Sequence, residues 1–312
     1  MVEALRSQEV TDPPAIETAG LSKTYGGGVR ALVDVDLRVE RGEVFGYLGP
    51  NGAGKSTTIR LLLGLIRPTV GRALLLGLDT QTSGVAARRR VGYLPGDLRL
   101  SDRITGREQL DSLARLRGHV DARYRDELCE RLDAVLDRPI RQLSRGNRQK
   151  IGIVQAFMHR PDVVVLDEPS AGLDPLLQGE MRILLTETAT SGATVFLSSH
   201  SLDEVQHVAD RVGIIRSGRL VDVGEVESLR ERSLRHVTIT FADAVPASAF
   251  SDLAGVRVTG SEATVVRLSA PEAAMDALLK TAARHRIVDF VAQPADLEEI
   301  FLELYREAHD GD

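Results

Sequence analysis

Short apolar runs of strand length recur along the first two thirds of the chain. Val44–Leu48 is one of them, and a helical pattern of apolar positions follows at Ile59–Ile66. Val163–Leu166 and Thr194–Leu197 are uniformly apolar, as expected of parallel strands that are buried on both faces. Helical periodicity over 176–190 separates these two runs. This alternation predicts an α/β domain built on a parallel sheet.

Between residues 103 and 160 the pattern becomes helical. Helical periodicity covers 105–117, 122–136 and 146–159, with little β pattern between them. We therefore expect a helical insert over about residues 100–160. Further strands are predicted at Arg72–Leu78, Val91–Leu94, Arg211–Ile215 and Arg219–Val223, the last two joined by the turn residues Ser217-Gly218.

The composition changes again after Ser233. Strand patterns at 236–241, 256–258, 264–268 and 287–291 accompany helical patterns at 271–284 and 295–306. The sequence thus predicts a polar tail over 1–15, an α/β domain over 16–232 and a small α+β domain over 233–312.

Composition narrows the class of protein. The 312 residues are 43% hydrophobic and 27% charged, with a net charge of −6, so a general affinity for nucleic acid is not expected. Cys129 is the single cysteine, which excludes an intrachain disulfide. The amino-terminal residues are polar and acidic, and no apolar run reaches the ~20 residues that span a bilayer. We expect a protein of the cell interior whose membrane role, if it has one, depends on a partner chain.

The candidate chemistry begins at a glycine-rich turn between the strand at 44–48 and the following helix. Glycines let backbone N–H groups point at an anion, and the amino-terminal end of the helix adds positive potential. Lys55 would reach the β- and γ-phosphates, and the hydroxyl of Ser56 would bind Mg²⁺. A turn that binds nothing is the alternative. The predicted phosphate-binding residues are Gly49, Pro50, Asn51, Gly52, Ala53, Gly54, Lys55, Ser56 and Thr57.

Two carboxylates end the buried strand at 163–166. Asp167 is expected to hold Mg²⁺, directly or through water, and Glu168 to polarise the attacking water. The alternative is that Asp167 caps a turn and Glu168 is simply solvated. A phosphate loop in the same chain favours the catalytic interpretation.

Ser144 precedes the third helical run of the insert. A serine there is an N-cap, and a helix amino terminus with a free hydroxyl is also an anion site. Because Ser144 belongs to a different subdomain from Lys55, a role in catalysis would require it to face a second copy of the chain.

Taken together, these motifs resemble those of the ATP-binding subunits of ATP-binding-cassette (ABC) transporters. Leu143–Asn147 is similar to the family signature Leu-Ser-Gly-Gly-Gln, with departures at Arg145 and Asn147. Ser170–Asp174 resembles the D-loop, Ser198-Ser199-His200 the switch histidine, and Tyr25 the aromatic position that stacks on adenine. The resemblance covers about residues 16–230. It implies a P-loop NTPase domain of the ABC type with an antiparallel β subdomain and a helical insert, followed by the small α+β domain.

The resemblance also implies how the site works. Two copies would meet head to tail, with each ATP held between the phosphate loop of one copy and the signature of the other. His200 would contact the γ-phosphate and orient water, and Glu168 would act as the base. Residues expected at the nucleotide outside the phosphate loop are Tyr25, Ser144, Gly146, Asn147 and Asp174.

One departure concerns the metal site. The family's Q-loop glutamine is expected after Tyr93-Leu94-Pro95, where this chain has Gly96. Asp97 is the nearest oxygen donor, and we expect Asp97 or a water to replace the missing amide.

The implied function is that of an ATPase subunit that powers export of a drug, antibiotic or lipid-like substrate through a separate membrane permease. The expected cofactors are ATP and Mg²⁺, and the expected location is the cytoplasmic face of the cell membrane, peripheral through the permease. The tail Ala295–Tyr305 is similar to that of such exporter subunits, although a domain that only stabilises a dimer fits equally well. An importer ATPase, or a non-transport ABC ATPase acting on ribosomes or DNA, remains an alternative.

Overall fold

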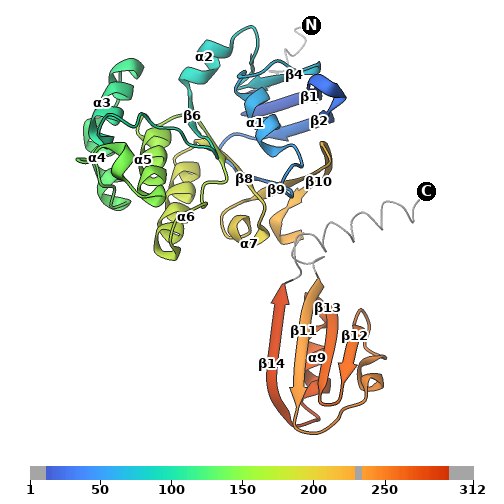
Figure 1. Cartoon of the computed structure of the whole chain (residues 1–312). Helices are drawn as coiled ribbons and strands as arrows, with labels where there is room; N and C mark the ends of the chain where they lie inside the picture. The colour runs from blue at the N-terminus through green and yellow to red at the C-terminus, as the bar shows by residue number, and fades with distance from the viewer. Residues whose placement is uncertain (1–11, 229–233, 295–312) are drawn as a thin grey trace, which may run out of the picture. The chain divides into compact units, whose positions relative to one another are not determined.

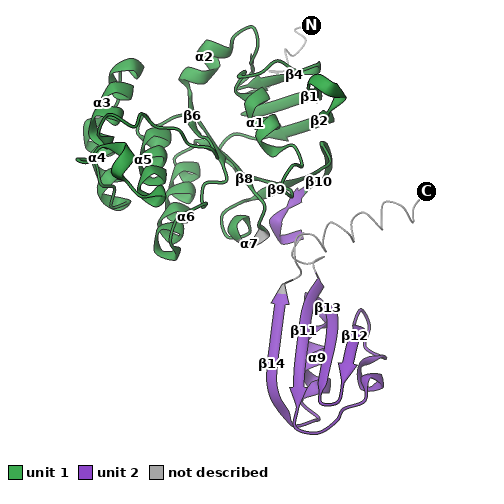
Figure 2. Ribbon diagram, in the orientation of Figure 1, with its two compact units in different colours: residues 1–223 green, residues 224–312 purple. Residues whose placement is uncertain are grey.

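The structure is a computed structural model that describes residues 12–228 and 234–294. It comprises two compact units, Met1–Val223 and Gly224–Asp312 (Figure 2). The predicted helix at 295–306 lies outside the described residues. The polar tail predicted over 1–15 extends too far at its carboxyl end, because Ala15 is fully buried and its N–H donates to the carbonyl of Val39 at 2.9 Å.

An antiparallel sheet opens unit 1, and Figure 1 shows it in blue. Its strand order is β2-β1-β4-β5. The strands are β1 (Ile16–Thr24), β2 (Arg30–Val39), β4 (Val70–Leu75) and β5 (Leu78–Asp79), with a 3₁₀ turn η1 (Gly26–Gly28) between the first two. The single strand predicted over 72–78 is therefore wrong. Leu76 and Gly77 take positive φ angles of 53° and 78°, which turn the chain back between β4 and β5.

The second sheet of unit 1 has the order β10-β9-β3-β8-β7-β6. Its strands are β3 (Val44–Leu48), β6 (Val91–Leu94), β7 (Val163–Asp167), β8 (Thr194–Ser199), β9 (Arg211–Arg216) and β10 (Arg219–Glu225). The five strands from β9 to β6 pair in parallel, and β3, β7 and β8 are completely buried. Register places Ser199 beside Leu48 and Ser198 beside Asp167, so the carboxyl ends of three strands meet at one edge.

Helices surround this sheet. They are α1 (Lys55–Leu62), α2 (Gly84–Arg89), α3 (Gly106–Arg117), α4 (Ala122–Arg131), α5 (Arg145–Phe157), α6 (Pro175–Thr190) and α7 (Leu202–Val205), with a 3₁₀ turn η2 (Ile140–Gln142) before α5. The helix predicted over 122–136 ends at Arg131, because Asp133 has a φ of +48° that no helix accommodates. The short helix α2 has no counterpart among the predicted elements.

The helices of the insert are fastened to α6. The guanidinium of Arg131 on α4 binds Glu180, and its Nη1 lies 2.6 Å from Glu187 Oε2, both on α6. Arg160 stacks 3.7 Å above the ring centroid of Tyr124 on α4. The ion pairs of Arg131 tie α4 to the helix that follows the D-loop, and the Arg160 contact ties α4 to the segment between α5 and β7.

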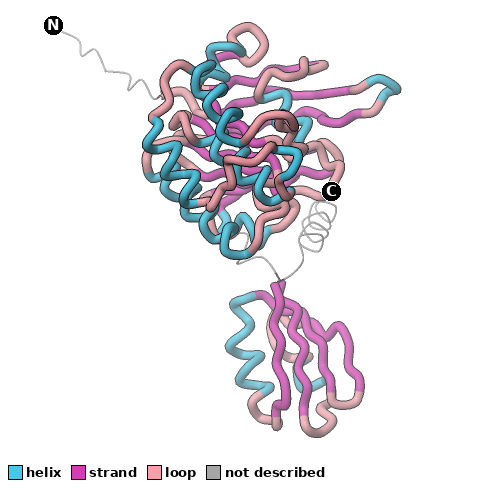
Figure 3. Tube along the Cα trace, turned by 60° about the vertical axis from the view of Figure 1, so that its left-hand side comes forward, coloured by secondary structure: helices cyan, strands magenta, loops and turns pink. Residues whose placement is uncertain are grey.

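Unit 2 is built on an antiparallel sheet of order β12-β13-β11-β14 (Figure 1), with a helix beside the strands (Figure 3). Its strands are β11 (Leu234–Phe241), β12 (Arg257–Glu262), β13 (Val265–Pro271) and β14 (Ile287–Pro294). The described part of this unit also contains the helix α9 (Met275–Ala282) and the 3₁₀ turns η3 (Ala247–Phe250) and η4 (Glu272–Ala274). Alternate residues Val237, Ile239 and Phe241 form the core with Phe250 and Leu278. Within the described ranges 12–228 and 234–294, no helix is long and apolar enough to cross a bilayer.

A histidine at the end of α5 couples folding of unit 1 to pH. His159 Nε2 lies 3.2 Å from the carbonyl oxygen of Val91, and Arg117 Nη2 donates to the same oxygen at 3.1 Å. Burial, reinforced by the nearby charge of Arg117, lowers the pKa of His159 to about 4. The neutral ring is therefore the form that the fold accepts.

We expect unit 1 to lose stability as the pH falls from about 6.5 towards 4, because the unfolded chain then binds a proton that folded His159 rejects. The loss should be about 1–2 kcal/mol, after allowance for solvent near a partly exposed ring. Thermal unfolding of wild type and His159→Gln between pH 7.5 and 5 would measure it, and the variant should show the weaker pH dependence. His207→Gln, an exposed histidine, is the control. Equal slopes for wild type and His159→Gln would contradict the assignment.

Candidate functional site

The loop between β3 and α1 has the tight geometry of a phosphate cradle. A Cβ on Gly49 would lie 2.4 Å from the carbonyl oxygen of Ile215, so no side chain fits there. Gly54, the residue before α1, has a φ of +116°, and a Cβ would lie 2.8 Å from the carbonyl oxygen of Ala31. Gly54 offers no side chain to cap the helix, so an anion can take the place of the cap. The structure places the rest of the predicted set, Pro50, Asn51, Gly52, Ala53, Ser56 and Thr57, in this loop and the first turn of α1.

Lys55 is 6% exposed, and its ammonium is turned into the loop. Nζ donates to the carbonyl oxygens of Gly49 at 2.5 Å and Pro50 at 3.3 Å. A buried cation at this point provides the positive charge that a triphosphate requires.

Asp167 and Glu168 lie at the edge of the parallel sheet where β7 and β8 end. Ser198 Oγ donates to Asp167 Oδ1 at 2.7 Å, and Asp167 is 5% exposed. Glu168 has a φ of +52°, which is strained for a residue with a side chain. Its N–H donates to the carbonyl and hydroxyl oxygens of Ser198, each at 3.2 Å. Ser198 thus holds both carboxylate residues in place.

Glu168, the first residue after β7, contacts the first residue of α1 and the first residue after β8. Its Oε2 accepts a hydrogen bond from His200 Nδ1 at 2.7 Å, so Nδ1 carries the proton. Its Oε1 lies 3.2 Å from Lys55 Nζ in an ion pair, but it is buried and accepts no well-aligned hydrogen bond. An acceptor that is buried and incompletely satisfied can accept a hydrogen bond from a water or a substrate group.

The carboxylate of Asp167 would supply an oxygen ligand to a divalent cation. The position of Gly96 lies against its carboxylate, where a Cβ would stand 3.4 Å from Asp167 Oδ2. Glycine here lets the chain pass close to this carboxylate, and a carboxylate oxygen is a ligand of the kind that Mg²⁺ takes. Burial, with the charge of Asp167, raises the pKa of neighbouring Tyr93 to about 12, so that hydroxyl stays protonated. Asp97, the expected substitute ligand, instead forms an ion pair with Arg99 at 2.8 Å, with 75% of its side chain exposed.

The signature residues occupy the start of α5. Ser144 caps the helix, its Oγ accepting from the N–H of Asn147 at 3.2 Å. Gly146 packs closely, since a Cβ would lie 3.1 Å from the carbonyl oxygen of Gly172. Asn147 differs from expectation. Its amide is buried and makes paired bonds of 2.9 Å with the N–H and carbonyl of Val135, so it is used within the protomer.

The D-loop connects β7 to α6. Asp174 caps α6 by accepting from the N–H groups of Leu176 at 3.1 Å and Leu177 at 3.0 Å. Its expected contact with nucleotide would have to compete with this cap. Gln149 Nε2 of α5 donates to the carbonyl oxygen of Pro169 at 3.2 Å, which ties the signature helix to the turn after Glu168.

Tyr25 lies in the β1–β2 connection. Its side chain is half exposed, and Lys23 Nζ lies 5.3 Å from the ring centroid. The ring therefore has an accessible surface on which a flat base can stack.

Sequence reasoning missed the supporting roles of Ser198, Ser199, Glu204 and Gln149. The sequence signal that could have indicated these roles is the pair Ser198-Ser199 at the end of an apolar strand, since consecutive buried hydroxyls need partners. Their partners, however, come from other elements.

Ser198→Ala is expected to raise the Mg²⁺ concentration needed for half-maximal ATP hydrolysis by about 10–100-fold, because Asp167 loses the hydroxyl that orients it. A Mg²⁺ titration of phosphate release would measure the shift. Ser191→Ala, which removes a hydroxyl that donates to the carbonyl of Thr188 on α6, is the matched control. An unchanged Mg²⁺ requirement would show that Asp167 needs no such support.

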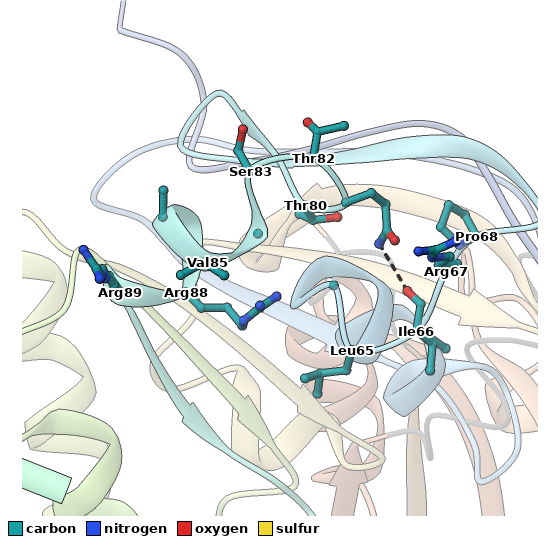
Figure 4. Close-up of a pocket in the computed structure, with 14 residues that line it drawn as sticks. Leu65, Ile66, Arg67, Pro68, Thr80, Thr82, Ser83, Val85, Arg88 and Arg89 are labelled. Carbon is teal, nitrogen blue, oxygen red and sulfur yellow. Dashed lines mark hydrogen bonds between the residues drawn. The ribbon is translucent and has the colours of Figure 1, made fainter. Parts of the chain in front are cut away.

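A groove of about 1050 Å³ lies beside α2 (Figure 4). Apolar Leu65 and Val85, which are 54% and 66% exposed, line it together with Arg67, Arg88 and Arg89. Arg88 Nη1 donates to the carbonyl of Leu63 at 3.0 Å, which joins α2 to the segment after α1. The groove combines an apolar surface with positive charge.

Comparison with known proteins agrees with this geometry. The family described as ABC transporter matches residues 32–171. A daunorubicin/doxorubicin resistance ATP-binding protein of Streptomyces peucetius is 34% identical over 304 residues, which cover 93% of this chain and 92% of that protein. A bacitracin transport ATP-binding protein of Bacillus licheniformis is 35% identical over 73% of this chain and 75% of its own length. Among solved structures, an ATP-binding subunit of an ABC transporter superposes with a TM-score of 0.64 at 32% identity, covering 69% of this chain and 92% of that one.

Proposed function

Since the chain belongs to the ABC transporter family and is an ATP-hydrolysing subunit of it, we propose that it powers export of a drug, antibiotic or lipid-like substrate through a separate membrane permease. The observation that carries this proposal is the similarity to the daunorubicin/doxorubicin resistance protein along both units, over 93% of the chain. We also propose that the chain works at the cytoplasmic face of the membrane, held there by the permease. We assign the ATPase role to the domain over 16–232 and an accessory role to 233–312.

Binding of ATP rests on the phosphate loop. The N–H groups of the first turn of α1, over residues 55–57, and the ammonium of Lys55 face the β- and γ-phosphates, and Tyr25 stacks on adenine, which contributes about 1–3 kcal/mol. Lys55 must exchange its bonds to Gly49 and Pro50 for bonds to phosphate oxygens. Ser56 and Asp167 hold Mg²⁺, which when bound neutralises charge on the β- and γ-phosphates.

Hydrolysis uses Glu168 as the general base. The carboxylate accepts a proton from water as the water oxygen attacks the γ-phosphorus, and the bond to the β-phosphate oxygen breaks. Lys55 and His200, which hold Glu168 here, are the groups that face the γ-phosphate when ATP is bound. ATP therefore releases Glu168 from Lys55 and gives it access to water.

The second half of each site comes from another copy of the chain. Ser144 and Gly146, at the amino terminus of α5, would approach the phosphates of the nucleotide bound to the partner, with Asp174 beside them. Hydrolysis replaces one bridging anion with two separating ones and loosens this dimer.

We assign the groove beside α2 to the permease. Its apolar residues and arginines suit an amphipathic helix that carries acidic side chains. Helix α2 leads directly into β6, which ends near Gly96 and Asp167, so an occupant of the groove is mechanically connected to the metal site. Export can therefore respond to hydrolysis.

Val85→Asp and Leu65→Asp are expected to weaken binding to the permease by about 10–100-fold, because each puts a charge into an apolar contact. Hydrolysis by the isolated chain should change less than ~2-fold, since neither residue touches the site. Co-purification from membranes would measure binding. Leu116→Asp, at a leucine that is 82% exposed outside the groove, is the control. Permease binding equal to wild type would remove the groove from this role.

Transport itself tests the proposed function. Inside-out vesicles containing this chain and its permease should accumulate a fluorescent anthracycline only with Mg-ATP, and Glu168→Gln should abolish the uptake. Uptake by right-side-out vesicles would favour an importer. Recovery of the chain with ribosomes or DNA and not with membranes would contradict a transport role.

A further inference from the structure

The position of the His200 side chain depends on the backbone that carries it. Its ring is 59% exposed, so packing does little to hold it, yet its Nδ1 stands 2.7 Å from Glu168 Oε2. The contact also depends on where β8 ends, because His200 is the first residue after that strand.

Ser199, the residue before His200, is fully buried, and its hydroxyl joins two neighbours. It accepts from the N–H of Ser201 at 2.9 Å and donates to Glu204 Oε2 at 2.6 Å. The carbonyl of Ser199 also accepts from the N–H of Gly49 in the phosphate loop at 3.3 Å. The two residues that flank His200 are therefore held from both sides.

Glu204 itself is anchored on the sheet through α7. The adjacent Val205 is fully buried against Gly46 of β3, where a Cβ would lie only 2.2 Å from Val205 Cγ1. Only a glycine at position 46 lets α7 approach β3 this closely. This packing fixes the backbone of Glu204, so its carboxylate is held in position to accept the hydrogen bond from Ser199.

We propose that Glu204 and Ser199 are positioning residues that set His200 for hydrolysis. The chain of contacts runs from β3 through Val205 and Glu204 to the hydroxyl of Ser199, and from there to the backbone on both sides of His200. A carboxylate acceptor makes the Ser199 bond charge-assisted and short, so it resists bending of the loop. The inference rests on the proposed function, because it assumes that His200 acts at the γ-phosphate.

The test is a double-mutant cycle on the full chain. Glu204→Ala and Ser199→Ala should each lower kcat for Mg-ATP hydrolysis on the order of 10-fold, with KM changed less than ~2-fold, because His200 is displaced while the phosphate loop is intact. In a His200→Ala background, Glu204→Ala should lower kcat less than ~2-fold further. Glu204→Gln, whose amide oxygen still accepts the Ser199 hydroxyl, should recover kcat to within ~3-fold of wild type.

A matched control separates positioning from stability. Glu108→Ala removes another carboxylate that binds a hydroxyl and a backbone N–H, those of Thr105 at the start of α3, and should leave kcat unchanged. If Glu204→Ala lowers kcat as much without His200 as with it, the inference is overturned while the proposed ATPase stands. If His200→Ala does not lower kcat, both the inference and the role of His200 fail. If wild type hydrolyses no ATP, the proposed function fails.

Discussion

Replacing Glu168 with Gln is expected to lower ATP hydrolysis by about 10²–10⁴-fold, which is the contribution of a positioned general base. The amide keeps the shape of the side chain and can still accept from His200, but it cannot take a proton from water. The variant also loses the ion pair with Lys55, which removes one contact that competes with phosphate, so ATP affinity should not fall. Phosphate release and equilibrium binding of ATP would measure the two effects separately.

The same variant should form ATP-dependent dimers that persist, because ATP is bound and not cleaved. Size-exclusion chromatography with light scattering would detect them. Glu187→Gln is the matched control, since Glu187 lies on the surface of α6, where it pairs with Arg131 of α4. The hydrolysis rate of this variant should lie within ~2-fold of wild type. Rapid turnover by Glu168→Gln would remove Glu168 from the chemistry.

Mixing two inactive variants is expected to restore activity if each site is shared between copies. Lys55→Met removes the buried ammonium from the phosphate loop, and Ser144→Arg fills the start of α5 with a long side chain. Each variant alone should hydrolyse ATP at least about 10²-fold more slowly than wild type, because both of its sites are damaged. In a mixed dimer, both substitutions fall on one site and leave the other intact.

An equal mixture should therefore recover about a quarter of the wild-type rate, since half of the dimers are mixed and each has one intact site of two. Phosphate release after mixing would measure it. Ser144→Arg also loses an N-cap worth about 1 kcal/mol, so unfolding of that variant is compared with wild type. A mixture as inactive as its components, or wild-type turnover per protomer unaffected by dilution, would contradict the shared site.

Much of the fold was predictable because its signals are local. The buried strands β3, β7 and β8 appear as continuous apolar runs, which parallel strands covered on both faces require. The helix α3 begins at a capping box of Thr105 and Glu108, which both belong to one turn of chain. The boundary of α4 and the division between β4 and β5 were missed, because positive φ angles at Asp133 and at Leu76 and Gly77 decided them.

The candidate site was predictable where it depends on glycine turns and strand ends. Gly49, Lys55, Asp167 and Glu168 occupy the places that their spacing indicated, beside His200. Gly96 shows the limit. The resemblance to the ABC family implied a glutamine where this chain has Gly96, and the sequence suggested Asp97 instead, but Arg99 pairs with that carboxylate at the surface.

The sequence by itself determined the order of the motifs and the elements that carry them, because a phosphate loop and a buried strand are each specified by a few consecutive residues. Only the tertiary structure decided which polar side chains meet. Ser198 hydrogen-bonds to Asp167, which is 31 residues away along the chain, and Asn147 hydrogen-bonds to Val135, which is 12 residues away. A buried polar group must find a partner, but which partner it finds depends on the packing of segments that are far apart along the chain.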